Sequence, residues 1–478
     1  MSSGLGLRTW GLRFISTTER FSPLPLRDFR FSVSYKHNKL LTTCCSNTSD
    51  STTNKKKKKQ KVIVISGPTG AGKSKLALEL AKRINGEIIS ADSVQVYQGL
   101  DIGSAKPSLS DRKDVPHHLL DLRPPFEEYS VGQFFEDARQ VTEEIIDNGR
   151  VPIVAGGTGL YLRWYIYGKP DVPKASPEIA SQVQLELSEF QKNEDWEAAV
   201  QLVVKAGDSK AEELALNDWY RLRRSLEIIR ASGSPPSAFR VPYESYKQQY
   251  QSKLSDDSLN DTVSGDVLGE KLSQDLDYDF MCFFLSSQRL DLYRMIDCRC
   301  EDMLSGSDGI LAEASRLLDM GLLPNSHSAS RAIGYRQAME YLLRCREQGG
   351  RSSPQDFYYF LTEFQKASRN FAKRQMTWYR NELIYHWLDA SKPLEKVLDF
   401  ISAAYHDQTG NIVVPESLRM KKELSNRKQI SMLNSYRSKN RYFVSREDCS
   451  DVLDWIRRTQ GENSEVKGKT RGVVCESS

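Results

Sequence analysis

The sequence lacks the features that mark several common classes of protein. Its 478 residues include only eight cysteines. None of them has the C-x-x-C spacing, so neither a disulfide framework nor a zinc ribbon is indicated, and a reducing compartment is expected. No run of about eighteen apolar residues occurs, which excludes a membrane-spanning helix. The net charge is only +4, so composition alone does not require a nucleic-acid partner.

The first sixty residues differ in composition from the rest of the chain. Residues 1–39 contain five arginines and only two acids, with many serines and threonines, as in an organelle transit peptide. Residues 55–59 are five consecutive lysines, which suit a solvated linker better than a nuclear signal. We therefore exclude residues 1–60 from the fold. We expect an organelle, a plastid rather than a mitochondrion, with the cytosol and a merely disordered tail as the alternatives.

A glycine-rich loop is the most specific local motif. Residues 67–74 read GPTGAGKS and match G-x-x-x-x-G-K-[ST], in which backbone N–H groups cradle phosphates. The β-branched segment 61–66 predicts a buried strand before the loop, and apolar residues at every fourth position of 76–84 predict a helix after it. This order favours a phosphate site over a chance glycine turn. Lys73 would then reach a phosphate, and the Ser74 hydroxyl would bind Mg²⁺.

Further buried strands are predicted to end beside this loop. EIISAD (87–92) ends in Asp92, and VPIVAGG (151–157) ends in a glycine turn that leads to Thr158. Another buried strand is predicted at 280–287. Strands alternating with helices predict an α/β fold, a P-loop NTPase-like parallel sheet flanked by helices. Because parallel strands end at one edge, Asp92 and the glycine turn should lie near the loop.

The remaining pattern divides the chain into a core, inserts and a helical C-terminal part. Proline and charged helical segments follow residue 167, and a Ser- and Asp-rich stretch follows residue 244. Asn217 is expected to cap the helix with which the core resumes. We expect a core at 61–167 and 217–390, a small helical insertion domain at 168–216, a polar insert at 245–277 and a basic C-terminal extension at 391–478.

Three basic clusters lie on predicted helices and alternate with aromatic residues. Cations bind phosphates and aromatic faces stack on bases, so the clusters indicate a nucleic-acid partner, although a charge run is more often a solvated helix surface. The clusters are Arg221 with Arg224, Arg331 with Arg336, and Lys373 and Arg374 with Arg380, beside Tyr335, Phe371, Trp378 and Tyr379.

Seven segments in this order resemble the tRNA dimethylallyltransferases, also called tRNA isopentenyltransferases. They are GPTGAGKSKLALELA, ISADSVQVYQGLDIGSAKPS, VPHHLLD, IVAGGTGLYL, NDWYRLRRSLEI, RAIGYRQ and SRNFAKRQMTWYR. The resemblance covers roughly residues 61–385. Together with the leader, it is typical of a plant organelle member that resembles the bacterial enzymes.

The resemblance implies which phosphates the loop holds. In that family the loop binds the diphosphate of dimethylallyl diphosphate, whose five-carbon group moves to the exocyclic amine of adenosine-37 beside the tRNA anticodon. Diphosphate is released, and turnover of the modified tRNA supplies cis-type cytokinins. The resemblance implies a diphosphate-binding loop of Gly67, Pro68, Thr69, Gly70, Ala71, Gly72, Lys73 and Ser74, with Mg²⁺ on Ser74.

The resemblance also assigns roles to four catalytic residues. Lys73 and Arg221 would neutralise the leaving diphosphate. Asp92 would accept the proton of the adenine amine as the amine attacks, since that amine is a poor nucleophile. Thr158 would lie by the reacting centre. The alternative for Asp92 is a turn or helix cap.

The resemblance further implies that tRNA binds as an anticodon stem-loop whose target base is flipped out. Ser93 and Gln95 would read the adenine edge. The chain is expected to act as a monomer, without a membrane. The residues expected to contact tRNA are Asp92, Ser93, Gln95, Lys106, Thr158, Arg221, Arg224, Arg331, Gly334, Tyr335, Arg336, Lys373, Arg374, Gln375, Thr377, Trp378 and Arg380.

The C-terminal part departs from the pattern of many eukaryotic members. Cytosolic and mitochondrial members often carry a zinc finger with a C-x-x-C pair and two histidines. No such spacing joins Cys449, Cys475, His386 and His406, so we expect no zinc here. Our hypothesis is that basic side chains of 391–478 add phosphate contacts instead, through Lys421, Lys422, Arg437 and Arg441.

Three other interpretations stay open. An adenylate isopentenyltransferase would use the same loop and acid to prenylate AMP, ADP or ATP, but would not need KRQMTWYR and the helices before it. A P-loop small-molecule kinase would bind ATP and an acceptor alcohol. A catalytically silent RNA-binding protein is disfavoured by the intact Lys73, Ser74, Asp92 and Thr158.

Overall fold

A computed structural model describes residues 59–256, 276–306, 309–420 and 427–461. The predicted transit peptide and most of the polar insert lie outside the described residues, as do Lys421, Lys422 and Cys475. Within the described residues, no helix is both long and apolar enough to cross a bilayer.

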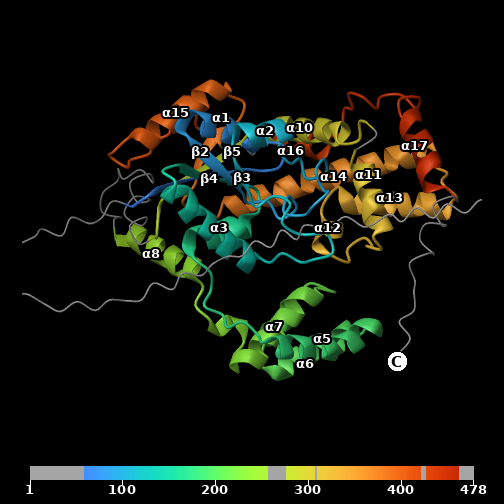
Figure 1. Ribbon diagram of the computed structural model, residues 1–478, viewed down its shortest axis with the longest axis horizontal. Coiled ribbons are helices and arrows are strands. Elements are labelled where there is room, and N and C mark those ends of the chain that lie inside the picture. Colours follow the sequence, from blue (N-terminus) through green and yellow to red (C-terminus); the bar gives the residue numbers. More distant parts are fainter. Residues whose placement is uncertain (1–58, 257–275, 307–308, 421–426, 462–478) are drawn as a thin grey trace, which may run out of the picture. The chain divides into compact units, whose positions relative to one another are not determined.

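The centre of the fold is a parallel sheet of six strands in the order β3-β2-β4-β1-β5-β6 (Figure 1). Ile63 of β1 is in register with Ile153 of β4 on one side and with Met281 of β5 on the other. All strand pairs are parallel, so the six strands end at one common edge. The strands are β1 Lys61–Ser66, β2 Gly86–Ser90, β3 His117–His118, β4 Val151–Gly156, β5 Asp279–Ser286 and β6 His386–Asp389.

Helices cover both faces of this sheet. The bounds of the α-helices before β5 are α1 Lys73–Ile84, α2 Leu109–Asp114, α3 Val131–Asp147, α4 Gly159–Tyr167, α5 Pro177–Lys192, α6 Trp196–Ala206, α7 Trp219–Ser232 and α8 Pro242–Asp256. Those after it are α10 Arg289–Asp302, α11 Ile310–Asp319, α12 Ser328–Arg331, α13 Tyr335–Glu347, α14 Pro354–Tyr379, α15 Leu394–His406, α16 Arg427–Asn434 and α17 Ser450–Gln460. Two short 3₁₀ turns are η1 Ser209–Glu213 and η2 Pro236–Ala238.

The alternation of side chains along β1 explains why two cores form. Val62 and Val64 point into one core, with α3, α4, α10, α13 and α14. Ile63 and Ile65 point into the other, with α1 and α15. Figure 1 shows α1 and α15 on the same face of the sheet. Successive residues of a strand face opposite sides, so a run that is apolar throughout predicts a strand buried on both faces. The predicted strand at 61–66 and the predicted α/β class are confirmed.

The C-terminal boundary of the core lies later than residue 390. α15 packs its Val397, Leu398 and Ile401 onto the same apolar core as α1, and Arg83 of α1 forms ion pairs with α15. Residues 394–406 therefore belong to the core, and the predicted extension from 391 is wrong in that part. β3 and β6 were not predicted, because strands of two and four residues carry too short a pattern.

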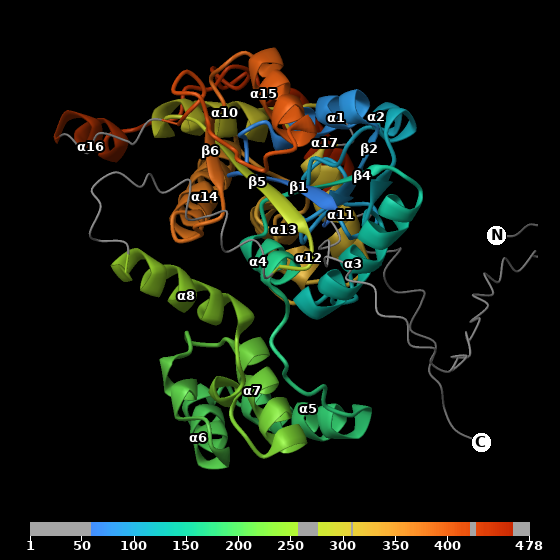
Figure 2. The same ribbon diagram turned by 90° about the vertical axis from the view of Figure 1, so that its left-hand side faces the viewer.

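The helical insertion includes a helix that the sequence placed in the core. Leu222, Leu226 and Ile229 of α7 pack against α5 and α6 in an apolar cluster of their own, and Figure 2 shows these three helices grouped. The boundary expected at 216 is therefore moved beyond α7. The predicted cap is also corrected: the Asp218 carboxylate, not Asn217, accepts a hydrogen bond from the Arg221 N–H at 3.2 Å.

Candidate active site at the carboxyl edge of the sheet

The glycine loop leaves β1 and turns directly into α1. Gly70 and Gly72 have φ of +82° and +86°, which places them in the left-handed region that favours glycine. The Ala71 N–H donates to the Pro68 carbonyl at 3.2 Å, and α1 begins at Lys73. The N–H groups of the first helical turn have no partner within the helix, so the loop and helix end favour an anion.

Two cations meet beside this loop. The Lys73 ammonium donates to the Pro68 carbonyl at 3.0 Å. Burial and the nearby charge of Arg299 lower the pKa of Lys73 to about 8, while the charge of Asp92 acts to raise it. Burial also lowers the pKa of Arg299 from its ordinary value, while Asp92 acts to raise it. Within the described residues the Arg299 guanidinium has no hydrogen-bond or ion-pair partner, and both cations are partly buried. An anion bound by the loop would supply the missing partner.

Asp92 lies two residues beyond the end of β2, close to the turn that follows β4. One Asp92 carboxylate oxygen accepts a hydrogen bond from the Val94 N–H at 2.9 Å. The Thr158 hydroxyl accepts one from the Ser93 N–H at 3.1 Å, and the Thr158 N–H donates to the Ala91 carbonyl at 3.3 Å. The structure therefore brings the ends of β2 and β4 together. The second carboxylate oxygen of Asp92 has no partner in the part of the chain that the structure describes.

Gln375 of α14 joins the glycine loop to the turn after β4. Its amide oxygen accepts from the Thr69 N–H at 2.9 Å, and its amide N–H donates to the Gly157 carbonyl at 2.9 Å. The side chain is buried. The sequence assigned Gln375 a tRNA contact, but the structure uses its amide to hold the two loops of the site together.

A buried carboxylate fixes the loop that follows Asp92. Glu313 of α11 accepts hydrogen bonds from the N–H groups of Asp101, Ile102 and Gly103 at 2.7, 2.8 and 2.9 Å. The Tyr335 hydroxyl donates to the same carboxylate at 2.7 Å. Gly103 packs so closely on the Tyr335 ring that a Cβ would lie 2.5 Å from the ring. Tyr335 is thus a buried support of the loop, in place of the predicted tRNA contact.

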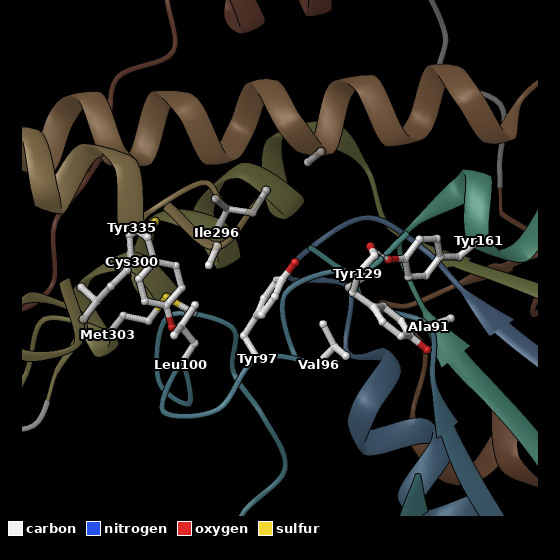
Figure 3. Close-up of a cluster of buried hydrophobic side chains, with 14 of the residues drawn as sticks. Ala91, Val96, Tyr97, Leu100, Tyr129, Tyr161, Ile296, Cys300, Met303 and Tyr335 are labelled. Carbon is white, nitrogen blue, oxygen red and sulfur yellow. Dashed lines mark hydrogen bonds between the residues drawn. The ribbon is translucent and has the colours of Figure 1, made fainter. Parts of the chain in front are cut away.

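The same loop continues into the apolar floor of the site. Figure 3 shows Tyr97 and Leu100 in one buried cluster with Ile296, Cys300 and Tyr335. The loop between Asp92 and Lys106 is therefore held from α10 and α13 by packing and from α11 by hydrogen bonds, which suits a loop that positions a substrate.

We expect Glu313→Ala to loosen this loop. Three backbone N–H groups and one tyrosine hydroxyl would lose their acceptor, and an unpaired buried donor costs roughly 1–3 kcal/mol. Hydrogen exchange at Asp101–Gly103 should accelerate at least about tenfold, since 1.4 kcal/mol corresponds to a factor of ten. The matched control is Tyr335→Phe, which removes one bond and keeps the ring. It should lower the free energy of unfolding by about 1 kcal/mol and leave these amides protected. Unchanged exchange in Glu313→Ala would refute the clamp.

Lys106 and Gln95 are also engaged within the protein. The Lys106 side chain is 1% exposed and its ammonium lies 2.7 Å from Asp101 and 2.5 Å from Asp121. The Gln95 amide accepts from the Ser90 hydroxyl and donates to the Ser104 and Ala105 carbonyls. Both residues therefore shape the loop, and their contacts with tRNA stay predictions.

The other predicted tRNA residues divide by exposure. Arg331, Lys373, Arg374, Thr377 and Arg380 are exposed on α12 and α14 or at the end of α14. Arg336 pairs with Glu340 at 3.8 Å. Gly334 is buried. The Trp378 ring lies under the Arg163 guanidinium, 3.9 Å from it, and is partly buried.

Arg221 and Arg224 lie on α7 rather than beside the glycine loop. Arg221 forms an ion pair with Asp218 at 3.4 Å and its side chain is 70% exposed. Arg224 pairs with Glu227. In the described residues no interaction joins Arg221 to Lys73 or Asp92, so its role at the diphosphate stays a prediction. Arg299, which the sequence analysis did not single out, is the cation that the structure places near Lys73.

The site thus combines an anion-binding loop, two cations and a carboxylate at one edge of a P-loop-like sheet. Cations and backbone N–H groups stabilise a departing phosphate group, and a carboxylate with a free oxygen can accept a proton from an attacking acceptor. Within the described residues no group of three His, Cys, Asp or Glu side chains could hold a metal. Fold and site together define a P-loop-like group transferase.

Comparison with known proteins identifies the family. The model of the IPP transferase family matches residues 95–382, and that of isopentenyl transferase matches residues 60–125. The chain is 63% identical to tRNA dimethylallyltransferase 9 of Arabidopsis thaliana over 84% of this chain and 87% of that protein. It is 38% identical to the tRNA dimethylallyltransferase of Protochlamydia amoebophila over 72% of this chain and 88% of that one. The chain therefore belongs to the IPP transferase family.

A solved structure supports the fold. A eukaryotic dimethylallyltransferase acting on tRNA matches with a TM-score of 0.52 and 23% identity, over 80% of this chain and 87% of that one. The similarity agrees with the parallel sheet and flanking helices described above.

Proposed function

We propose that this protein transfers a dimethylallyl group from dimethylallyl diphosphate to the exocyclic amine of adenosine-37 in tRNA, and releases diphosphate. The observation that carries the proposal is the placement of Lys73 and Arg299 beside the glycine loop, with Asp92 just beyond the end of β2, at the same edge of the sheet. A leaving anion and an acceptor that loses a proton need these two kinds of group on opposite sides of one carbon.

The diphosphate half of the reaction would depend on the loop and the two cations. Backbone N–H groups, Lys73 and Arg299 would bind the diphosphate and take up its growing negative charge as the allylic carbon departs. The partial burial of both cations would strengthen this interaction, because charges attract more strongly when water is displaced.

The acceptor half would depend on Asp92 and Thr158. The free carboxylate oxygen of Asp92 would accept the amine proton while its other oxygen stays on the Val94 N–H. The Thr158 hydroxyl accepts from the Ser93 N–H, so its own proton remains available to the substrate. Ser93 would then approach the adenine edge through its side chain.

The residues present fit Mg²⁺. The Ser74 hydroxyl, in the exposed first turn of α1, is one hard oxygen. Mg²⁺ is usually held by one or two protein oxygens and completed by phosphate oxygens and water. Bound there, the ion would supply further neutralisation of diphosphate charge.

The tRNA would be held by exposed cations rather than by the buried residues named in the sequence analysis. Arg331, Lys373, Arg374 and Arg380 supply positive charge. Phosphate contacts of this kind give affinity that falls with salt. The anticodon stem-loop is the part of tRNA that presents adenosine-37, so we propose that these cations bind its backbone.

We expect the Michaelis constant for dimethylallyl diphosphate to rise with pH above about 8. Lys73 has a pKa lowered to about 8, so at pH 9 only about one tenth of the free protein carries this charge. An anion that needs the ammonium then binds roughly tenfold more weakly at pH 9 than at pH 7. The control is Lys73→Arg, which stays protonated and should give a flat profile. A wild-type profile as flat as that of the variant would contradict the role of Lys73.

The proposal is tested by adding labelled dimethylallyl diphosphate to three parallel reactions. One contains unmodified tRNA, one contains AMP with ADP and ATP, and the third contains no acceptor. Label on tRNA alone is the expected result. Label on the free nucleotides would make the protein an adenylate isopentenyltransferase. Turnover of ATP without label transfer would favour the small-molecule kinase.

We also propose a product of tRNA turnover, a location in the cell and an oligomeric state. Turnover of the modified tRNA would release cis-type cytokinins. The leader would direct the chain to an organelle, a plastid before a mitochondrion, and a fusion of residues 1–60 to a fluorescent protein tests this. The protein would act as a monomer, which sedimentation with and without tRNA tests.

A further inference from the structure

A segment near the C-terminus binds a buried carboxylate of α10. We call residues Tyr436–Val444 the strap. The N–H groups of Arg441, Tyr442 and Phe443 donate to the Glu301 carboxylate at 2.9, 3.0 and 3.1 Å. Glu301 is 0% exposed. A buried charge requires such donors, so the strap and α10 are bound to each other through Glu301.

A second buried carboxylate of α10 binds the beginning of the strap. The Tyr436 hydroxyl donates to Asp297 at 2.8 Å. Arg369 of α14 forms an ion pair with Asp297 and donates to the Ser438 hydroxyl at 2.9 Å. Asp297 is 1% exposed. The two buried acids of α10 therefore both accept hydrogen bonds from the strap.

The strap is also anchored by an aromatic side chain near its end and by the helix that follows it, α17. Phe443 is buried against Phe357 of α14, with ring centroids 5.0 Å apart. Gln460, at the end of α17, accepts from Arg346 at 2.6 Å and donates to the Ser315 hydroxyl at 3.0 Å. The match to the IPP transferase family ends at residue 382, so these anchors lie outside it.

α10 contacts the glycine loop as well. Ile296 lies against Gly70, where an added Cβ would be 3.0 Å from the Ile296 side chain. The positive charge of Arg299 lowers the pKa of Lys73, which ends the glycine loop. Asp297 and Glu301 are four residues apart and share a face of the helix, whereas Arg299 is two residues from each, about 200° around the axis. One face of α10 therefore meets the strap and the other meets the glycine loop.

We propose that the strap is a positioning element that holds α10 against the glycine loop, so that Arg299 is placed for the diphosphate. The inference rests on the proposed function of that site. The hypothesis that basic side chains of 391–478 add phosphate contacts stays a prediction beside it. In the strap itself, Arg441 is paired with Asp302 at 2.6 Å, and three backbone N–H groups donate to Glu301.

The test compares Glu301→Ala and Glu301→Gln with the control Asp302→Asn in the full chain. Among the interactions of the described residues, Asp302 contacts the strap through its surface pair with Arg441 alone. In Glu301→Ala, hydrogen exchange at Arg441–Phe443 and in the glycine loop should accelerate. The Michaelis constant for dimethylallyl diphosphate should rise about 10- to 100-fold, the size of effect that a small misplacement has. Glu301→Gln, which keeps one acceptor, should fall in between, and Asp302→Asn should match the wild type.

Two readouts separate positioning from general damage or RNA binding. The Michaelis constant for tRNA and its salt dependence should not change in Glu301→Ala. The proposal would be overturned if hydrogen exchange accelerated in the strap but not in the glycine loop, and the Michaelis constant for dimethylallyl diphosphate did not change. Unchanged exchange in the strap, or a loss confined to tRNA affinity, would also overturn it.

Failure of the proposed function is recognised separately. If the wild-type protein transfers no dimethylallyl group, exchange in the glycine loop of Glu301→Ala still decides whether the strap positions α10. Should Glu301→Ala fail to fold, judged by its thermal unfolding, Glu301→Gln gives the same comparison.

Discussion

Replacing Asp92 by alanine should lower kcat for transfer to tRNA by about 10²- to 10⁴-fold, the usual contribution of a general base. The Michaelis constant for dimethylallyl diphosphate should change little, since the loop and the two cations that we propose to bind the diphosphate remain. The reason is that the adenine amine cannot lose its proton to a positioned acceptor once the free oxygen of Asp92 is gone. Single-turnover transfer of label, measured with both substrates saturating, gives kcat without product release.

Asp92→Asn separates the proton acceptor from the turn that Asp92 caps. The amide oxygen of asparagine can still accept from the Val94 N–H, so the turn is preserved, but the side chain cannot take up the amine proton. A loss as large as that of Asp92→Ala is expected. Full activity in Asp92→Asn would mean that Asp92 is a structural cap and that another group removes the proton.

Replacing Arg299 by alanine should lower kcat/KM by about 10³-fold. Loss of one donor to a developing oxyanion costs about 10²- to 10³-fold in kcat, and weaker binding of the diphosphate adds to it. The change also removes one of the two causes that lower the pKa of Lys73. The pKa of Lys73 should therefore rise, and the increase of the Michaelis constant with pH should begin at a higher pH than in the wild type.

The matched control for Arg299 lies on the same helix. Arg294 is 63% exposed and pairs with Asp291 at 3.0 Å, so Arg294→Ala removes a charge from α10 without touching the loop. It should keep kcat/KM within about threefold, as expected for a surface residue. Arg299→Lys should recover part of the activity, because a lysine keeps the charge but not the fork of donors. Equal losses in Arg294→Ala and Arg299→Ala would show that only the net charge of α10 matters.

Local patterns were sufficient to predict the part of the fold that forms the glycine loop. Strand, glycine loop and helix follow each other within 61–84, so their order is visible without tertiary information. The rule that parallel strands end at one edge also predicted that Asp92 and Thr158 would approach each other, which the Ser93–Thr158 hydrogen bond confirms. What the rule cannot give is the orientation of helices that arrive from far along the chain.

Arg299, Gln375 and Glu313 were missed as supports of the site for that reason. Each lies on a helix whose charged and polar residues looked alike in the sequence, and only packing decides which of them faces inward. For Tyr335, whose burial was also missed, the sequence did carry a signal. Tyr335 precedes Ala338, Met339 and Leu342 at helical spacing, which indicates a buried face and not a surface for stacking on bases.

The same limit explains the C-terminal part. Residues 391–478 are polar and mixed in sequence, so a basic extension was the natural prediction. Val397 and Phe443 are nevertheless buried. Val397 lies in the same apolar core as α1, and Phe443 packs against α14. Two buried acids in α10, Asp297 and Glu301, require partners, and the sequence does not say that the strap supplies them.

Analysis of both products of one reaction tests directly whether the protein prenylates tRNA beside the anticodon. Unmodified tRNA is incubated with the full chain and dimethylallyl diphosphate, then digested, and the nucleosides are identified by mass spectrometry while released diphosphate is counted. The account predicts one diphosphate for each isopentenyladenosine, found only next to the anticodon, and neither product with Asp92→Asn. Diphosphate released without prenylated tRNA, or a prenyl group found only on free adenine nucleotides, would contradict it.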